Sequence, residues 1–197
     1  MARHREFDPE KALETAMLLF WEKGYEGTSY ADLCAATGVA RPSLYATFGD
    51  KQALFFKALE RYMQQEMRFL QEALQEPTAL QVVETMLKQS ALANTQQDKP
   101  QGCLGINGAL ACSDKALPIQ ETLNHNRAAA FQALQERLER AQREGDMPQA
   151  TDAATVTRMV MTLTQGVAVQ AKAGASRQQI HEMLDLAVAM LRPHVSA

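Results

Sequence analysis

The part of the sequence that decides the fold runs from Ser29 to Lys51 and reads SYADLCAATGVARPSLYATFGDK. Two short helical stretches, 30–37 and 41–48, flank the tripeptide Gly38-Val39-Ala40. Two short helices joined by a tight turn that contains glycine have the spacing of a helix-turn-helix. An ordinary helical hairpin inside a core has the same spacing, so the surface of the second helix must decide between the two.

The outward face of the second helix suits DNA better than a protein core. Leu44 and Phe48 occupy its inward stripe. An exposed tyrosine beside serine and threonine hydroxyls can contact phosphates and base edges. The outward side chains are those of Arg41, Ser43, Tyr45, Ala46 and Thr47. Lys51 follows at the start of the next helix, where its charge and the free backbone N–H groups favour a phosphate.

Helix signals continue on both sides of this segment. Asp8 and Pro9 are typical of a helix start, and Gly24 ends that helix. Apolar residues recur at three- and four-residue spacing through most of the remaining chain. The further helical ranges are about 51–75, 80–93, 104–112, 118–144, 152–173 and 176–191. No strand or repeat is predicted, so the fold class is all-α with about nine helices.

The composition agrees with a helical globular protein. Hydrophobic residues make up 46% of the 197 residues and charged residues 22%, which excludes a disordered chain or a fibre. The net charge of −3 provides no global attraction to nucleic acid or to a membrane. No leader and no membrane-spanning run is predicted. With three cysteines, which cannot all pair, we expect a reduced, cytoplasmic protein.

Three motifs surround the predicted turn in a fixed order. They are GYEGTS at 24–29, TGVARPSLY at 37–45 and FGDK at 48–51. Together they resemble the TetR/AcrR family of bacterial transcriptional regulators. The resemblance implies a helix-turn-helix DNA-binding domain over 1–52 and a ligand-binding and dimerisation domain over 53–197. Its implied partners are a double-stranded DNA operator, a second copy of the chain and a small-molecule inducer, and we expect neither enzyme activity nor a cofactor.

The resemblance also assigns roles to individual residues. The predicted DNA-contacting residues are Ser29, Tyr30, Arg41, Pro42, Ser43, Tyr45, Ala46, Thr47 and Lys51. Residues 41–43 would face the bases, while Tyr45, Thr47 and Lys51 would face phosphates. This chain departs from the family at two positions, since many members have histidine at Thr47 and a large residue at Ala46. Threonine can still bond a phosphate, but Ala46 offers only a methyl contact.

The predicted DNA-binding domain carries a net negative charge, which DNA repels. Residues 1–52 contain six Lys or Arg and eight Asp or Glu, a formal net charge of −2. Binding must therefore depend on where the cations lie. Arg41 is the only cation on the second helix, so we expect it to be the main base contact. The Arg3-His4-Arg5 tail is either an arm that contacts DNA or a solvated terminus.

A second motif lies in the middle of the chain. Gly102-Cys103-Leu104, followed by small residues up to Ala109, is similar to a box in a subset of the family in which some members sense oxidants or electrophiles through cysteine. Cys103, at an expected helix start and near Lys99, is predicted to react before Cys112. The alternative is two small core residues and a non-covalent inducer. The predicted ligand-binding or sensing residues are Cys103, Asn107, Leu110 and His125. No metal site is predicted.

The last two predicted helices carry aliphatic stripes that suit a dimer. Two copies of such a helix pair form a four-helix bundle around a two-fold axis. The alternative is that both helices complete a monomeric core. The predicted dimerisation residues are Val160, Leu163, Val167, Ile180, Leu184, Val188 and Leu191.

The sequence therefore predicts a ligand-responsive transcriptional repressor. It would bind a palindromic operator as a dimer and be released by a small-molecule or electrophile inducer. The alternative is a helical enzyme or small-molecule-binding protein whose head has lost DNA binding, and an operator-binding assay distinguishes the two.

Overall fold

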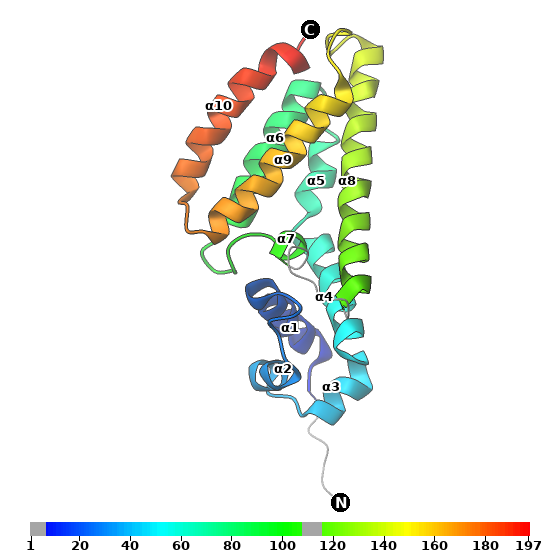
Figure 1. Cartoon of the computed structure of the whole chain (residues 1–197), viewed down its shortest axis with the longest axis vertical. Helices are drawn as coiled ribbons and strands as arrows, with labels where there is room; N and C mark the ends of the chain where they lie inside the picture. Colours follow the sequence, from blue (N-terminus) through cyan, green and yellow to red (C-terminus); the bar gives the residue numbers. More distant parts are fainter. Residues whose placement is uncertain (1–6, 108–115) are drawn as a thin grey trace, which may run out of the picture.

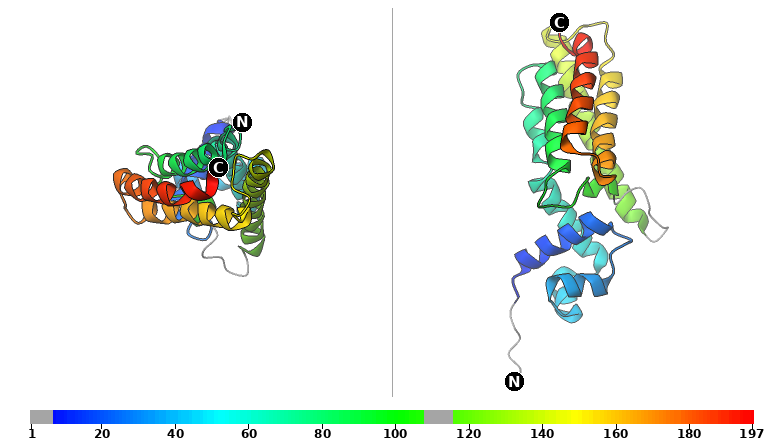
Figure 2. Two further views of the ribbon diagram at one scale, coloured as in Figure 1. Left: turned by 90° about the horizontal axis from the view of Figure 1, so that it is seen from above. Right: turned by 90° about the vertical axis from the view of Figure 1, so that its left-hand side faces the viewer.

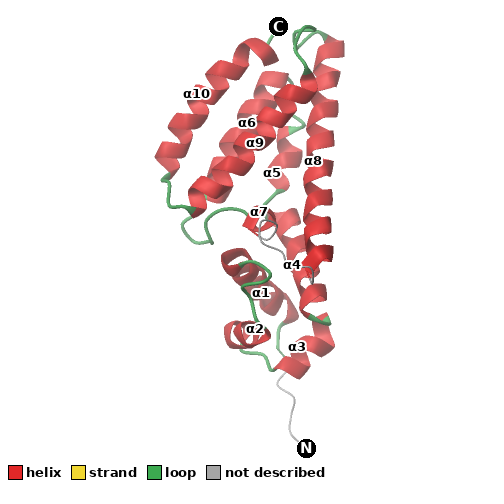
Figure 3. Cartoon of the chain, in the orientation of Figure 1, coloured by secondary structure: helices red, strands yellow, loops and turns green. Residues whose placement is uncertain are grey.

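Ten α-helices and no strand form the described part of the chain, residues 7–107 and 116–197 of a computed structural model (Figure 3). The predicted all-α fold class is confirmed for these residues. None of the described helices is long and apolar enough to cross a bilayer. The helices are α1 (Pro9–Lys23), α2 (Tyr30–Thr37), α3 (Arg41–Phe48), α4 (Lys51–Gln65), α5 (Arg68–Ala73), α6 (Ala79–Asn94), α7 (Leu104–Asn107), α8 (Leu117–Glu144), α9 (Ala153–Lys172) and α10 (Arg177–Val195). The predictions for the tail at 3–5, for Leu110 and for Cys112 concern residues outside the described ranges.

The helices form a head and a body that lie end to end (Figures 1 and 2). The head contains α1, α2 and α3 and lies at the end where the N-terminus is drawn. The body contains α5, α6, α8, α9 and α10, which run along the long axis, and the C-terminus lies at its far end. Since α4 begins in the head and continues into the body, one helix joins the two parts.

Local side-chain and glycine signals fix the ends of the head's helices. The Asp8 carboxylate accepts hydrogen bonds from two N–H groups in the first turn of α1. Ser29 and Asp32 form a reciprocal capping box at the start of α2. Gly38 ends α2 in the left-handed conformation, with φ 69°, which glycine adopts without strain. The helix-turn-helix geometry is therefore encoded within this short segment.

Aromatic side chains fill the core of the head. Phe20, Trp21 and Phe55 are at most 1% exposed, and the rings of Phe20 and Phe55 meet edge to face with their centroids 5.1 Å apart. Leu33 from α2 and Leu44 from α3 are buried in the same core. This burial determines which face of α3 points outward.

The range 51–75, predicted as one helix, forms two helices with a break at Glu66 and Met67. The Met67 N–H bonds to the Tyr62 carbonyl, five residues back, at 3.3 Å. The Glu66 carboxylate accepts a hydrogen bond from the Lys99 ammonium at 2.5 Å and another from the Gln96 amide at 3.0 Å. The break coincides with contacts to a loop some 30 residues away, and no glycine or proline marks it in the sequence.

The body is built around α6, which packs against α9 and α10, while α8 packs against α9. The aliphatic stripes predicted to face a second copy point into this core. Exposed fractions of only 0–6% are found at Val160, Val167, Ile180, Leu184, Val188 and Leu191. Leu163 is half-buried against the same core. The structure corrects the dimer prediction for the six buried residues, because a side chain buried within its own protomer has no surface left for a partner.

Candidate nucleic-acid interface and ligand cavity

The outer face of α3 presents to solvent the side chains that the sequence predicted for DNA. Leu44 and Phe48, 1% and 7% exposed, anchor the helix on the head. No acidic residue lies on α3. The exposed residues of α3 are Arg41, Pro42, Tyr45, Ala46 and Thr47, and Ser43 is half-buried. A phosphate or base edge approaching this face meets hydroxyl groups and one guanidinium.

Tyr30 of α2 supports both ends of α3. The guanidinium carbon of Arg41 lies 4.7 Å from the centroid of the Tyr30 ring, a cation–π contact at the start of α3. The Tyr30 hydroxyl donates to the Gly49 carbonyl at 3.0 Å, at the end of α3. Partial burial and the Asp50 carboxylate raise the pKa of Tyr30, which keeps its hydroxyl protonated. Tyr30 and the capping residue Ser29 are thus engaged within the protein and position α2 and α3.

Lys51 has its ammonium group on the protein's own carbonyl oxygens. It donates to the carbonyls of Tyr25 and Thr28, both at 2.9 Å, and lies 4.1 Å from the centroid of the Tyr25 ring. Burial lowers the pKa of Lys51, although the Glu26 carboxylate opposes that shift. In this structure Lys51 holds residues 25–28 against α4, which is a positioning role, and its contact with phosphate stays a prediction.

The loop before α2 explains why the first motif contains two glycines. Gly24 ends α1 with φ 73°. Gly27 cannot carry a side chain, because a Cβ there would overlap the carbonyl oxygen of the last residue of α1. Thr28 is fully buried and donates its hydroxyl to the Gly24 carbonyl at 2.7 Å. This loop presents the two carbonyl oxygens that Lys51 contacts.

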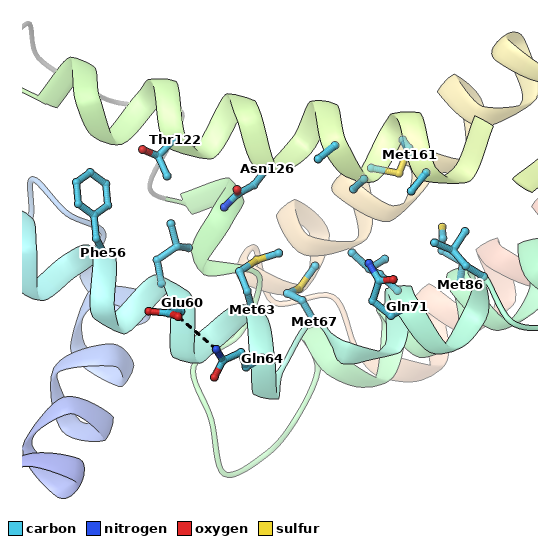
Figure 4. A pocket seen from close by; sticks show the side chains of 16 residues that line it. Phe56, Glu60, Met63, Gln64, Met67, Gln71, Met86, Thr122, Asn126 and Met161 are labelled. Carbon is cyan, nitrogen blue, oxygen red and sulfur yellow. Dashed lines mark hydrogen bonds between the residues drawn. The ribbon is translucent and has the colours of Figure 1, made fainter. Parts of the chain in front are cut away.

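A cavity of about 620 Å³ lies in the body between α4, α5 and α8 (Figure 4). Four methionines contribute to its wall, and their flexible, polarizable side chains adapt to apolar guests of different shapes. They are Met63, Met67, Met86 and Met161. Among the described residues that line the cavity, Glu60 is the only charged one. A cavity of this size and character suits a small organic molecule.

A smaller lobe of about 70 Å³ continues the cavity toward α7, since Met63, Met67 and Met161 line both. Cys103 lines this lobe and is 7% exposed. Its Sγ accepts a hydrogen bond from the Tyr62 hydroxyl at 3.2 Å. Burial, with the neighbouring thiol, raises the pKa of Tyr62 well above its usual value, so the hydroxyl keeps its proton. A small molecule that reaches Cys103 must therefore enter the lobe.

The other residues predicted together with Cys103 lie elsewhere. His125 is exposed on α8, and Asn107 contacts α1. Lys99, expected beside the thiol, pairs with Glu66. The sequence does not identify the methionines of the cavity, because an apolar residue on the inward face of a helix can belong either to the core or to a cavity wall.

In residues 7–107 and 116–197, no group of three or more His, Cys, Asp or Glu side chains could hold a metal.

Hydrogen bonds connect the head to the segment that lines the small lobe. The Trp21 indole donates to the Gly102 carbonyl at 2.8 Å, and the Asn107 amide donates to the Trp21 carbonyl at 3.4 Å. The Lys172 ammonium, at the end of α9, donates to the Glu22 carbonyl at 3.0 Å. The end of α9 and the segment that lines the small lobe are thus both bonded directly to α1.

Two family models match this chain, and between them they cover the head and most of the body. The model described as "Bacterial regulatory proteins, tetR family" matches residues 12–58. The model described as "Tetracyclin repressor-like, C-terminal domain" matches residues 79–187. The two matches follow the same order as the head and body of the fold.

Relatives of known role and solved structures agree with these models over nearly the whole chain. The HTH-type transcriptional repressor ComR of Escherichia coli K12 is 36% identical over 92% of this chain and 87% of its own length. The repressor BdcR of the same organism is 31% identical over 90% and 86%. A cysteine mutant of the TetR family regulator CifR, solved with a 26-base-pair operator, has a TM-score of 0.90 at 32% identity, covering 95% of this chain and 98% of CifR. The chain therefore belongs to the TetR family of bacterial regulatory proteins and is a DNA-binding transcriptional regulator.

Proposed function

We propose that this protein is a repressor that binds a palindromic operator as a dimer and is released from it by an inducer. The observation that carries the proposal is the outer face of α3, where one guanidinium stands among exposed hydroxyl groups without an acid. Stacking on Tyr30 restrains Arg41 at the start of the helix. An arginine fork pairs with O6 and N7 of guanine in the major groove.

Half of the eight acids in residues 1–52 are engaged in ion pairs, although acids outnumber basic residues there. These four pair with basic side chains on other elements, and Arg61 is shared by two of the four. These ion pairs are Asp32–Lys23, Glu10–Arg61, Glu14–Arg61 and Glu22–Lys172, with N–O distances of 2.8 to 3.5 Å. The local charge at α3 is therefore more favourable to DNA than the domain total of −2.

A different face of α9 and α10 supports the dimer. Once the aliphatic stripes are assigned to the core, large apolar side chains remain exposed on the opposite side of both helices. They are Met159, Val169, Met183, Leu186 and Met190, with exposed fractions of 37–64%. Gly166 lies between Met159 and Val169 and permits close approach of a second helix. Two copies joined through this face would form a four-helix bundle.

The cavity supports release by a ligand. Cys103, Gly105 and Ile106 line the small lobe, and the same segment bonds to α1 through Gly102 and Asn107. A ligand that displaces this segment would also displace α1 and change how the head meets the DNA. In this proposal residues 1–52 bind the operator, and residues 53–197 bind the ligand and form the dimer.

The electrophile form of the proposal rests on Cys103. Of the two cysteines in the described residues, Cys103 lines the small lobe of the cavity, whereas Cys34 is half-buried in the head. Labelling of wild type and Cys103→Ser with an electrophile, followed by an operator-binding assay, separates covalent from non-covalent induction. A full response in Cys103→Ser assigns induction to non-covalent binding in the cavity.

Selection from a randomised duplex library tests the DNA-binding part of the proposal without knowledge of the operator. We expect an enriched palindrome whose half-sites lie about 34–36 Å apart, or a multiple of that distance. Affinity for this palindrome should fall with added salt. If no sequence is enriched, the alternative of a helical ligand-binding protein with an inactive head is favoured.

A further inference from the structure

A third space, of about 330 Å³, opens between α8 and α9 and is lined by two arginines and an aromatic ring. Arg127 and Phe131 lie one helical turn apart on the same face of α8. Arg158 reaches across from α9 and places its guanidinium carbon 5.2 Å from the centroid of the Phe131 ring. Both cations and the ring therefore line one space, with Met161 and Gln165 completing the wall.

The positive charge of this space is not neutralised within the described residues. Neither arginine takes part in any ion pair found there. Arg127 donates to the Gly105 carbonyl at 3.4 Å and to the Asn124 side-chain oxygen, both of which are neutral acceptors. No acidic residue lies three or four positions from Arg127 or Arg158. Two cations on one wall repel each other until an anion lies between them.

This space adjoins the apolar cavity, because it shares lining residues with the cavity and its small lobe. Met161 lines all three spaces, and Gln165 lines both this one and the small lobe. Glu60 and Met161 lie toward opposite ends of the large cavity (Figure 4). Glu60 therefore lies at the end of the large cavity away from Met161, the residue that this cavity shares with the space between the two arginines.

We propose that the inducer is an amphipathic organic acid, whose carboxylate lies between Arg127 and Arg158 and whose apolar part extends past Met161 into the cavity. The proposal rests on the ligand-released function above and names the chemical class of that ligand. Arginine binds carboxylates through paired, charge-assisted hydrogen bonds. The Phe131 ring gives apolar contact next to the head group, while Glu60 repels the carboxylate from the far end and so sets the orientation.

Three probes of one chain length test the proposal by calorimetry on the full-length protein: decanoate, decanol and decylamine, each below its micelle-forming concentration at neutral pH. Decanoate should bind about tenfold or more tightly than decanol, since a hydrogen bond to a charged group exceeds one to a neutral group. Decylamine should bind more weakly than both. The double variant Arg127→Gln with Arg158→Gln should lower the affinity for decanoate to that for decanol and leave decanol binding unchanged.

Two further variants keep the test interpretable. Arg140→Gln removes an exposed cation from the same helix and should change no affinity. Arg158→Lys keeps the charge and should retain part of the preference for decanoate, while thermal unfolding checks that each variant is folded.

Several outcomes overturn the proposal. They are equal affinity for decanoate and decanol, decanoate binding that survives the double substitution, and no decanoate binding at millimolar concentration. Preferential binding of decylamine would instead assign the ligand's charge to Glu60. These measurements use no DNA, so failure of the operator-binding proposal would appear separately, as the absence of an enriched palindrome.

Discussion

The indole nitrogen of Trp21 donates a hydrogen bond to the carbonyl oxygen of Gly102 at 2.8 Å, across 81 positions of the sequence. Trp21 belongs to the head, and Gly102 begins the segment that lines the small lobe. Gly102 has φ 83°, and a Cβ there would lie 2.9 Å from the Ala168 carbonyl oxygen, so only glycine fits. A close backbone approach to α9 and one buried hydrogen bond from α1 thus hold Gly102 between the body and the head.

Trp21→Phe tests this connection. The variant keeps an aromatic ring near Tyr62 but leaves the buried Gly102 carbonyl without its donor, so the free energy of unfolding should fall by about 1–3 kcal/mol. Urea denaturation measures the loss, and Tyr45→Phe, which alters an exposed ring, should show none. The variant should still bind operator but respond less to inducer. An undiminished response in a folded Trp21→Phe variant would show that another contact carries the signal.

Arg41→Ala should relax operator specificity at one base pair of each half-site. A bidentate arginine–guanine contact provides about 1–3 kcal/mol of discrimination against other bases. Binding to a panel of single-base operator variants measures this, with Arg68→Ala, an exposed arginine of α5, as the control. Unchanged sequence preference in Arg41→Ala would mean that α3 enters the groove in a different register.

The head could be predicted from the sequence because its signals are local. The predicted ranges 30–37 and 41–48 are the observed bounds of α2 and α3. The Ser29–Asp32 capping box and Gly38 act over at most four residues, so no knowledge of the rest of the fold is needed to recognise them. The all-α class follows from the same kind of signal repeated along the chain.

The face of each helix that packs inside the body could not be predicted in this way. Leu184 is 1% exposed and Leu186 is 64% exposed, although both are leucines on α10. Apolar residues occur on two faces of this helix, and the positions of α6 and α9 decide which face is buried. The role of Lys51 likewise depends on the carbonyl oxygens of a loop that is more than 20 residues away.

These two leucines provide a matched test of the dimer surface. Leu186→Glu places a charge on the exposed apolar face, so it should give a folded monomer in light scattering and weaken operator binding. Leu184→Glu buries an unpaired charge in the core, so it should unfold or strongly destabilise the protomer. Leu117→Glu, at an exposed leucine of α8, is the control and should remain dimeric. A dimeric Leu186→Glu variant would place the interface elsewhere.

Asp32 should make the head sensitive to acid. Hydrogen bonds from Lys23 and Ser29 hold the pKa of Asp32 well below its ordinary value of 3.8. Because the folded-state pKa is depressed, this contribution to stability is present above the unfolded-state pKa and is lost as the pH falls below it. The unfolding free energy of Asp32→Asn should therefore change less than that of wild type between neutral pH and about pH 3. Asp185→Asn, on the exposed side of α10, should retain the wild-type dependence.

Lys51→Met distinguishes a positioning role from a phosphate contact. Methionine keeps much of the side-chain length but cannot donate to the Tyr25 and Thr28 carbonyls, so the free energy of unfolding should fall by about 1–2 kcal/mol. The slope of log affinity for operator against log salt should stay at the wild-type value, because no phosphate contact is lost. If Lys51 instead bound phosphate, the slope would decrease by about one for each half-site, while stability would hardly change. Lys57→Met, at an exposed lysine of the same helix, controls for the loss of one positive charge and should alter neither quantity.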